Sequence, residues 1–307
     1  MACKAVLVGI NLYDGYIRHK GHVVPLQRHR LYGCVNDVHS ISDLLIQHFG
    51  FVPADIQELT DGSAIQSAIL AALKGMVNSA APGDRLLFYF SGHGSLYRRT
   101  PPSNDPKREE PIFEILCPYD MDWDQEIFIS ESDLRNIVNL LPDGAAIEMV
   151  LDACGAGGMR RIVREYGSLM QMPLLSRAAD ASLPQSLRFL VPPPEVLARI
   201  MSAQGNMANP RIMSTLGSAG PKRCILWAAS GADQISDEFI PSHGLEHGAF
   251  TFFLNEVLTA TSALDRGIVL QEVSQRLKEE RFRQVPGLFP DLPLITQNRF
   301  LNPGEFT

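Results

Sequence analysis

The sequence has no apolar segment long enough to cross a membrane. The apolar run near the amino terminus, residues 5–8, is far shorter than the roughly 20 residues of a membrane-spanning helix. It is also too short for the apolar core of a secretory signal peptide. We therefore expect a soluble, cytoplasmic protein with no membrane partner.

Cysteine is scarce and irregularly spaced. An odd, scattered set without a C-x-x-C pair argues against a disulfide framework and against a structural zinc site. The five cysteines are Cys3, Cys34, Cys117, Cys154 and Cys224.

Positive charge is not in excess. The chain has 27 Lys and Arg against 34 Asp and Glu, for a net charge of −7. A nucleic-acid-binding protein usually carries a basic stripe, so we expect no nucleic-acid partner. With 45% hydrophobic and 20% charged residues, the composition is that of a globular protein with one large domain or two small ones.

Segments with the pattern of buried strands alternate with segments of helical period. The alternation predicts an α/β layered domain with a mainly parallel sheet. The polar stretch 11–30 is interpreted as a loop. Strands are expected at 4–10, 56–59, 85–90, 112–117, 145–151, 224–229 and 292–295, and helices at 36–49, 63–77, 131–140, 195–201, 248–259 and 268–281.

Residues 160–222 have a different character. They are rich in Ala, Ser, Pro, Met and Arg and keep no regular apolar period. A segment of this length without regular structure is usually a functional loop or a linker.

Polar residues that could take part in catalysis follow two of the predicted strands. Ser91-Gly92-His93-Gly94 comes after one, and Asp152-Ala153-Cys154 comes after another. Because parallel strands end at the same edge of a sheet, His93 and Cys154 are expected to face each other. A thiol beside an imidazole is the minimum set for thiol catalysis. The backbone N–H groups of Gly94 and Cys154 are candidate donors to an oxyanion.

Each of these residues also has a simpler interpretation. A cysteine at the end of a strand is more often a core residue than a nucleophile, and a histidine in a loop is often a surface residue. The glycine-rich run Gly155–Gly158 resembles part of a nucleotide-binding loop. It lacks the third glycine at the required spacing and a clear amphipathic helix after it. The combination of His93 with Cys154 therefore favours catalysis.

Several motifs, in this order along the chain, resemble those of the caspase-like cysteine peptidases, and in particular the metacaspases and their bacterial relatives. They cover nearly all of the chain outside residues 160–222. The motifs are Ala5–Asn11, Leu31–Asp37, Phe88–Gly94, Leu151–Cys154, Ala229–Gln234 and His247–Thr251.

The resemblance implies a caspase-type α/β/α sandwich with a mainly parallel central sheet. It also implies one caspase-like domain over residues 1–307. Within it, residues 1–159 would be a large-subunit-like part, 160–222 a linker open to cleavage, and 223–307 a small-subunit-like part. His93 and Cys154 would be the catalytic dyad.

The resemblance further implies a pocket for the side chain that precedes the cleaved bond. Two carboxylates in it would complement an Arg or Lys head group, whereas caspases that cut after aspartate need a basic pocket. Substrates would therefore be proteins or peptides cut after Arg, with Lys as the second choice. The implied pocket residues are Cys34, Asp37, Ser91 and Asp152, with Ser230 and Asp233 as further candidates. The simpler interpretations are a helix-start carboxylate for Asp37 and a turn residue for Asp152.

The linker carries arginines that such a peptidase could cut itself. This suggests a zymogen activated by linker cleavage, by an activating protease or by another regulator. Two alternatives are a catalytically inactive caspase-like binding module and a nucleotide-binding α/β protein. The linker arginines are Arg160, Arg161, Arg164, Arg177, Arg188, Arg199 and Arg211.

The chain departs from the family pattern in two places. Gly155 and Ala156 stand where a His and a Ser often follow the nucleophile, and we expect activity to survive this change. Many metacaspases bind Ca²⁺ through aspartates, and Asp120, Asp122 and Asp124 form an acidic run here. The expected site lacks acids elsewhere, so a solvated acidic loop is the alternative. We expect no required cofactor.

Overall fold

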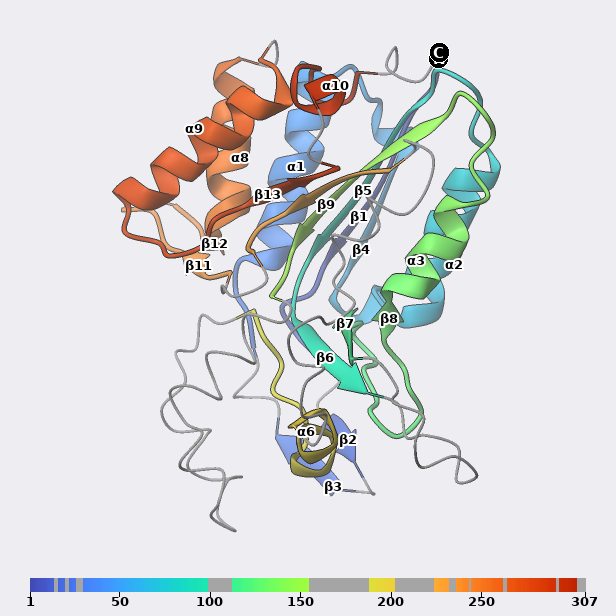
Figure 1. Ribbon diagram of the computed structural model, residues 1–307, viewed down its shortest axis with the longest axis vertical. Coiled ribbons are helices and arrows are strands. Elements are labelled where there is room, and N and C mark those ends of the chain that lie inside the picture. Colours follow the sequence, from blue (N-terminus) through green and yellow to red (C-terminus); the bar gives the residue numbers. More distant parts are fainter. Residues whose placement is uncertain are drawn as a thin grey trace.

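A six-stranded sheet forms the centre of the computed structural model (Figure 1). The structure describes residues 1–13, 16–19, 22–25, 30–98, 112–154, 188–201, 224–231, 236–242, 244–261, 264–290 and 293–302. The strand order is β13-β10-β9-β5-β1-β4, and only β13 is antiparallel to its neighbour. These strands are β1 (Cys3–Gly9), β4 (Ile56–Thr60), β5 (Arg85–Ser91), β9 (Ala146–Asp152), β10 (Cys224–Ala228) and β13 (Gly287–Phe289).

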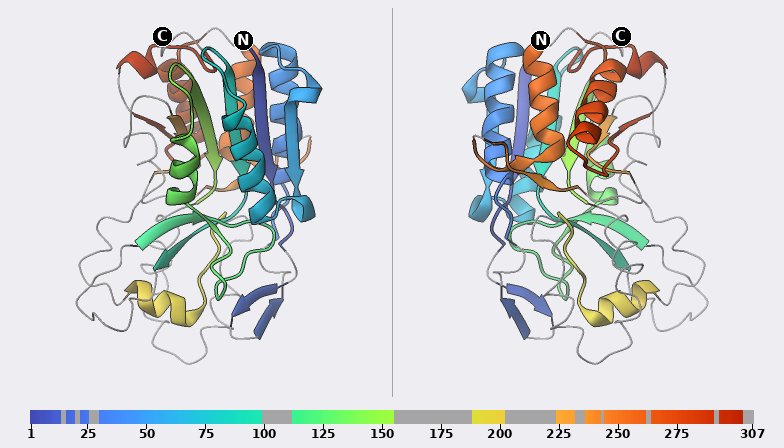
Figure 2. Two further views of the ribbon diagram at one scale, coloured as in Figure 1. Left: turned by 90° about the vertical axis from the view of Figure 1, so that its right-hand side faces the viewer. Right: turned by 90° about the vertical axis from the view of Figure 1, so that its left-hand side faces the viewer.

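Helices cover both faces of this sheet (Figures 1 and 2). One face carries α1 (Cys34–His48), α8 (Ala249–Ala260) and α9 (Arg266–Glu279), and the other carries α2 (Gln66–Asn78) and α3 (Glu131–Val138). Successive strand residues point to opposite faces, so each buried strand supplies two apolar cores. In β5, Phe88 and Phe90 join the core under α2, while Leu87 and Tyr89 join the core under α1 and α8. The mainly parallel sheet with helices on both faces confirms the predicted α/β fold.

Smaller elements gather near the carboxyl ends of the parallel strands (Figure 2). A second sheet has the antiparallel order β6-β7-β8, and α6 packs against β6. The bounds are β6 (Gly94–Arg98), β7 (Ile112–Leu116), β8 (Ile129–Ser130), α6 (Pro194–Met201), the hairpin β2 (Tyr16–His19) and β3 (His22–Pro25), and the pair β11 (Glu238–Phe239) and β12 (His247–Gly248). The remaining short helices are η2 (Pro53–Asp55), η3 (Asp61–Ser63) and α10 (Pro293–Thr296).

Two expectations for local structure were wrong. The stretch 11–30 contains the hairpin β2–β3 instead of only a loop. The strand expected at 292–295 is the helix α10 instead, because Pro293 stands at its first position, where the missing N–H costs nothing and the fixed φ favours helix. In the described part of the chain, no helix has the length and apolar character needed to span a membrane.

Candidate active site

The ends of β5 and β9 bring the two predicted catalytic residues together. Ser91 pairs with Asp152 in the parallel register, and the Gly92 N–H donates to the Asp152 carbonyl at 3.3 Å. A Cβ added at Gly94 would lie 2.0 Å from the carbonyl oxygen of Cys154. The backbone beyond His93 therefore abuts the backbone of Cys154, and only glycine fits at this contact. Both His93 and Cys154 are buried.

Tyr13 holds His93 in place. The Tyr13 hydroxyl accepts a hydrogen bond from the His93 N–H at 2.6 Å, and the two rings are tilted with centroids 4.9 Å apart. The His93 carbonyl accepts from the Cys117 N–H at 3.0 Å. Burial raises the pKa of Tyr13 well above its ordinary value, so the phenol is neutral. Sequence reasoning missed Tyr13 because it lies in a polar stretch without a regular period.

The Cys154 thiol lies against the backbone of Ser236. Its Sγ accepts a hydrogen bond from the Ser236 N–H at 2.7 Å and lies 3.3 Å from the Ser236 carbonyl oxygen. Burial raises the pKa of the Cys154 thiol, and the Ser236 N–H opposes that rise only in part. In this state the thiol is therefore protonated.

Arg188, one of the linker arginines, is completely buried beside these residues. Its Nη2 lies 2.9 Å from Asp37 Oδ2, and its Nη1 lies 3.3 Å from Asp152 Oδ2. Nη1 also donates to Ser91 Oγ at 2.7 Å and to the Asp152 carbonyl at 3.1 Å. Three of the four predicted pocket residues thus contact one guanidinium.

Cys34 and Glu238 complete the surroundings of this guanidinium. Burial raises the pKa of the Cys34 thiol, and the positive charge of Arg188 opposes this rise only in part. The Cys34 side chain is also hydrogen-bonded to Ser91. Glu238 Oε1 lies 3.9 Å from Arg188 Nη2. The pKa of Glu238 is raised above its ordinary value, because the effect of burial outweighs the lowering by Arg188 and by the N–H groups of Gly33 and Tyr32. Sequence reasoning missed Glu238, since no motif marks it and it follows Cys34 by 204 positions.

Residues from the last third of the chain fix the two aspartates. Asp37 Oδ1 lies 3.0 Å from His247 Nδ1 and accepts from the Gly248 N–H at 3.1 Å. Asp152 accepts from the hydroxyls of Ser236 and Thr251 at 2.5 and 2.6 Å. Both carboxylates are fully buried, and both face Arg188. Asp37 does lie in the first turn of α1, as the simpler interpretation of a helix-start carboxylate has it, and it contacts Arg188 as well. Asp152 is the last residue of β9 and not a turn residue.

The backbone carbonyl of Arg188 is hydrogen-bonded to both predicted oxyanion donors. The Arg188 carbonyl oxygen accepts from the Gly94 N–H at 3.0 Å and from the Cys154 N–H at 3.2 Å. The Arg188 N–H donates to the Ser236 carbonyl at 3.3 Å. An arginine thus fills the pocket while its carbonyl group lies on the backbone of the predicted nucleophile.

The other predicted residues lie elsewhere. Ser230 is half-buried just after β10 and makes no hydrogen bond with Arg188 in the part of the chain that the structure describes. Arg199 lies on α6, with its guanidinium 5.8 Å from the Tyr97 ring. Asp233, the run Gly155–Gly158 and the linker arginines Arg160, Arg161, Arg164, Arg177 and Arg211 lie outside the described residues.

The acidic run does not fit a Ca²⁺ site. Asp120 Oδ1 accepts from the Gln66 N–H at the start of α2, at 2.8 Å. Asp122 Oδ1 accepts from the N–H groups of Asp124 and Gln125. The carboxylates of Asp120 and Asp122 thus hold separate backbone segments. Within the described ranges, no three His, Cys, Asp or Glu side chains gather where they could hold a metal ion.

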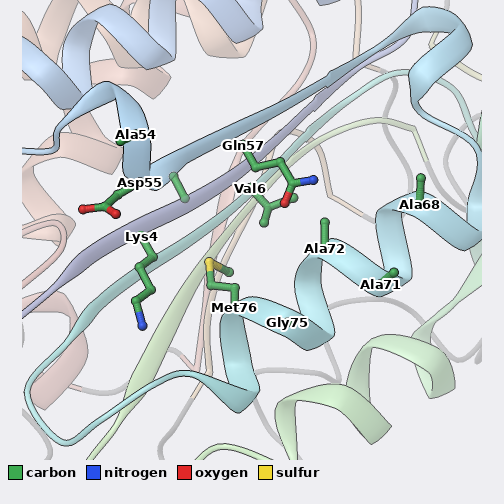
Figure 3. Close-up of a pocket in the computed structure, with 11 residues that line it drawn as sticks. Lys4, Val6, Ala54, Asp55, Gln57, Ala68, Ala71, Ala72, Gly75 and Met76 are labelled. Carbon is green, nitrogen blue, oxygen red and sulfur yellow. The ribbon is translucent and has the colours of Figure 1, made fainter.

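Two hollows near the described surface are distinct from the pocket around Arg188. One has a volume of about 540 Å³ and lies between α2 and the edge of the sheet, with Lys4 and Asp55 beside small side chains of α2 (Figure 3). The other, of about 490 Å³, lies between α1, α8 and α9 and includes His247. Neither contains His93, Cys154 or Arg188.

Comparison with known proteins identifies the family. The model for the metacaspase, peptidase C14 domain matches residues 3–162, just over half of the 307 residues. This chain is 34% identical to Metacaspase-7 of Arabidopsis thaliana over 164 residues, which is 52% of this chain and 36% of that protein. It is 27% identical to Metacaspase-1 of Schizosaccharomyces pombe over 312 residues, covering 95% and 68% of the two chains.

A solved structure matches the fold. The crystal structure of protein GSU0716 from Geobacter sulfurreducens superposes with a TM-score of 0.65 at 17% identity, over 97% of this chain and 98% of that one. Together, the fold and the family match define a protein of the caspase-like cysteine peptidase class. The chain belongs to the metacaspases, peptidase family C14, as the sequence motifs predicted. It spans less than half the length of the Arabidopsis relatives that it matches.

Proposed function

We propose that this protein is a cysteine endopeptidase that cleaves after Arg, with Lys as a poorer substrate, and that its uncut form is a zymogen inhibited by its own linker. The observation that carries the proposal is Arg188. Its side chain lies between Asp37 and Asp152, and its carbonyl oxygen accepts from the N–H groups of Gly94 and Cys154. This is the arrangement expected of the residue that precedes a cleaved bond.

The preference for Arg over Lys follows from the way the pocket divides its contacts. Nη2 of Arg188 contacts Asp37, while Nη1 contacts Ser91 and Asp152. A planar guanidinium presents two terminal nitrogens in fixed directions, whereas an ammonium presents one. A lysine in the same place would leave one buried carboxylate without its cationic partner, which is costly.

The proposed reaction uses the dyad in two steps. His93 takes the proton of the Cys154 thiol, and Sγ attacks the carbonyl carbon of the arginine. The N–H groups of Gly94 and Cys154 stabilise the oxyanion. His93 returns its proton to the leaving amine as the C–N bond breaks, which leaves a thioester. His93 then takes a proton from water as the water oxygen attacks the thioester, and returns it to Sγ as the C–S bond breaks. This restores the thiol and releases a carboxylic acid, which loses its proton to the solvent.

The same geometry supports inhibition before cleavage. In the uncut chain Arg188 fills the pocket, and burial keeps the Cys154 thiol protonated. A substrate arginine must displace Arg188 before it can bind. The bond between Arg188 and Phe189 is the one that this arrangement presents to Cys154, so we propose it as the first site of self-cleavage.

Self-cleavage is tested by following the intact mass of the purified chain. We expect the wild type to give two fragments that meet between Arg188 and Phe189. Cys154→Ala and His93→Ala should stay uncut, and Arg188→Ala should lose this cut. Arg199→Ala removes a linker arginine on α6 outside the pocket and serves as the matched control. Equal cutting at position 188 in the Arg188→Ala chain would overturn the assignment.

Peptide turnover separates this proposal from the alternatives. Fluorogenic peptides ending in Arg, Lys or Asp are assayed with the processed protein, with Ca²⁺ or with a chelator. We expect turnover after Arg, weaker turnover after Lys, and no requirement for a cofactor. No turnover under any condition would favour the inactive binding module, and turnover after Asp would contradict the pocket assignment.

A further inference from the structure

We infer that the active site has two apolar subsites on the far side of the cut, which select a large apolar residue at each of the first two positions after the arginine. The inference rests on the proposed function, because it takes residues 188–190 as a bound substrate. Phe189 and Leu190 occupy these subsites in the uncut chain. The preferred substrates would then be peptides in which the arginine before the cut is followed by two bulky apolar residues.

The backbone of this segment pairs with the first residue of β6 through one parallel β-bridge, as at the start of an added strand. Gly94, the first residue of β6, forms a parallel bridge with Phe189. The Gly94 N–H donates to the Arg188 carbonyl at 3.0 Å, and the Leu190 N–H donates to the Gly94 carbonyl at 2.9 Å. Addition of a strand to a sheet edge is a general mode of peptide recognition, in which the backbone gives affinity and the side-chain pockets give specificity.

Ser95 provides a contact that reaches only the second residue after the cut. Its hydroxyl donates to the Leu190 carbonyl at 2.6 Å, and Ser95 is completely buried on β6. A buried hydroxyl without a partner is costly. Ser95 therefore favours a substrate whose chain continues for at least two residues beyond the cut bond, in the direction that β6 sets.

The side chains at these two positions are removed from water. Phe189 is 3% exposed and Leu190 is 0% exposed. Both belong to the apolar core that also contains Leu96 and Tyr97 of β6. A charged side chain at either position would be buried without a partner, which is strongly unfavourable. The subsites therefore discriminate against acidic residues as well as against small ones.

Internally quenched peptides test the selection in trans. Three peptides share the same residues up to Arg and continue with Phe-Leu, Ala-Ala or Asp-Asp. With the self-processed full chain, kcat/KM for Phe-Leu should exceed that for Ala-Ala by about tenfold or more, because a single methylene in an apolar pocket already gives about tenfold. Asp-Asp should be the poorest substrate. Equal values for the three peptides, or a preference for Asp-Asp, would overturn the inference.

A Ser95→Ala variant tests the position of the second subsite. It should lower kcat/KM for the Phe-Leu peptide several-fold. The loss should be much smaller for an arginyl coumarylamide, since that substrate has no residue after the cut. Ser274→Ala is the matched control, because the Ser274 hydroxyl also donates to a backbone carbonyl, that of Leu270, but does so within α9. An equal loss on both substrates would show that Ser95 acts only through the fold and would count against the subsite.

The two proposals fail in different ways. If no peptide with Arg is cleaved, the proposed function fails and the subsites fail with it. If all three peptides are cleaved alike, the arginine specificity stands and only the selection after the cut is wrong. Burial of Phe189 and Leu190 would then serve only to hold the linker in place.

Discussion

Arg188 takes its position from charge. Two fully buried aspartates and the largely buried Glu238 surround a single guanidinium. Buried carboxylates are stable only when paired and hydrogen-bonded. A pocket with this excess of negative charge binds a cation strongly, whether the cation comes from the linker or from a substrate.

We expect Asp152→Asn to lower kcat/KM for Arg peptides by about a hundredfold, because it removes the negative charge that faces the buried guanidinium without changing the size of the side chain. Steady-state kinetics on the processed protein measure this. Asp43→Asn, at an exposed position of α1, should have no effect. An unchanged kcat/KM in the Asp152→Asn chain would mean that substrate arginine binds elsewhere.

Motif resemblance predicted Asp37, Asp152 and Ser91 as pocket residues, and these three contact Arg188. It gave no role to Ser236 or Thr251, which fix Asp152 from 84 and 99 positions further along the chain. Ser236 is a single hydroxyl residue in an irregular segment and belongs to no motif, whereas Thr251 ends the motif His247–Thr251 but lies in α8, where the sequence does not show which residue it contacts. Their importance depends on tertiary contacts that one sequence does not display.

The amino-terminal end of α8 closes one side of the pocket. A Cβ at Gly248 would lie 2.2 Å from Asp152 Oδ2 and 2.7 Å from Arg188 Cζ. The Thr251 N–H, in the first turn of α8, donates to Asp152 Oδ2 at 3.2 Å. The start of this helix thus stabilises the carboxylate and also sets the width of the space for a guanidinium.

Gly248→Ala should therefore lower the rate of cleavage after Arg on the order of a hundredfold, as displacements of about 1 Å do in active sites. Peptide kinetics measure the loss. Gly75→Ala is the matched control, because a Cβ there meets nothing within 4 Å and alanine favours the helix. Full activity in the Gly248→Ala chain would contradict the close approach at this position.

The carboxylate of Asp84, in the turn before β5, joins that turn to the start of the chain. Asp84 accepts from the N–H groups of Ala2 and Ala81 at 2.7 and 3.0 Å, and so fixes the start of β1. Burial raises the pKa of Asp84, but these two donors and Lys4 outweigh burial, and the pKa is lower than its ordinary 3.8. The carboxylate therefore adds stability above pH 3.8, and this contribution is lost as the pH falls through the lower value.

In a Cys154→Ala background, which stays uncut, Asp84→Asn should reduce the free energy of unfolding at pH 7 by about 1 kcal/mol. The difference between the two chains should shrink as the pH falls below 3.8 and through the lower pKa of the native state, because both chains then carry a neutral side chain. Urea unfolding at several pH values measures it. A difference that grows in acid would have the wrong sign for this explanation.

The long elements were predicted because each carries many residues of one period. Helix α1, for example, was expected at 36–49 and spans Cys34–His48, and it ends before Gly50, whose φ of +73° favours glycine. Strand β13 has three residues and the hairpin strands have four. Such short segments offer too few positions to define a period.

Over the whole molecule, the chain segments on the two sides of the linker form one sheet. β10 follows the linker and pairs with β9 over five residues in parallel register. Trp227 of β10 donates to Glu148 of β9 at 3.0 Å, and Glu148 is also paired with the buried Arg266 of α9. The segments on either side of the proposed cut therefore share a core and a buried ion pair.

After cleavage between Arg188 and Phe189, we expect the two fragments to remain together as one particle. The processed protein should elute in size-exclusion chromatography with the uncut Cys154→Ala chain and separate only in denaturant. The reason is that dissociation would expose the apolar face between β9 and β10 to water and separate Glu148 from Trp227 and Arg266. Two smaller peaks in native buffer would contradict this expectation.

The burial of Arg188 has a consequence for control. Under the proposed function, this arginine is a competitive inhibitor joined to its own enzyme, so its effective concentration is set by the chain and is on the order of millimolar. Dilution does not weaken it, and ordinary levels of substrate do not displace it. Whether a molecule is active then depends on whether its own chain has been cleaved, and not on the concentration of substrate.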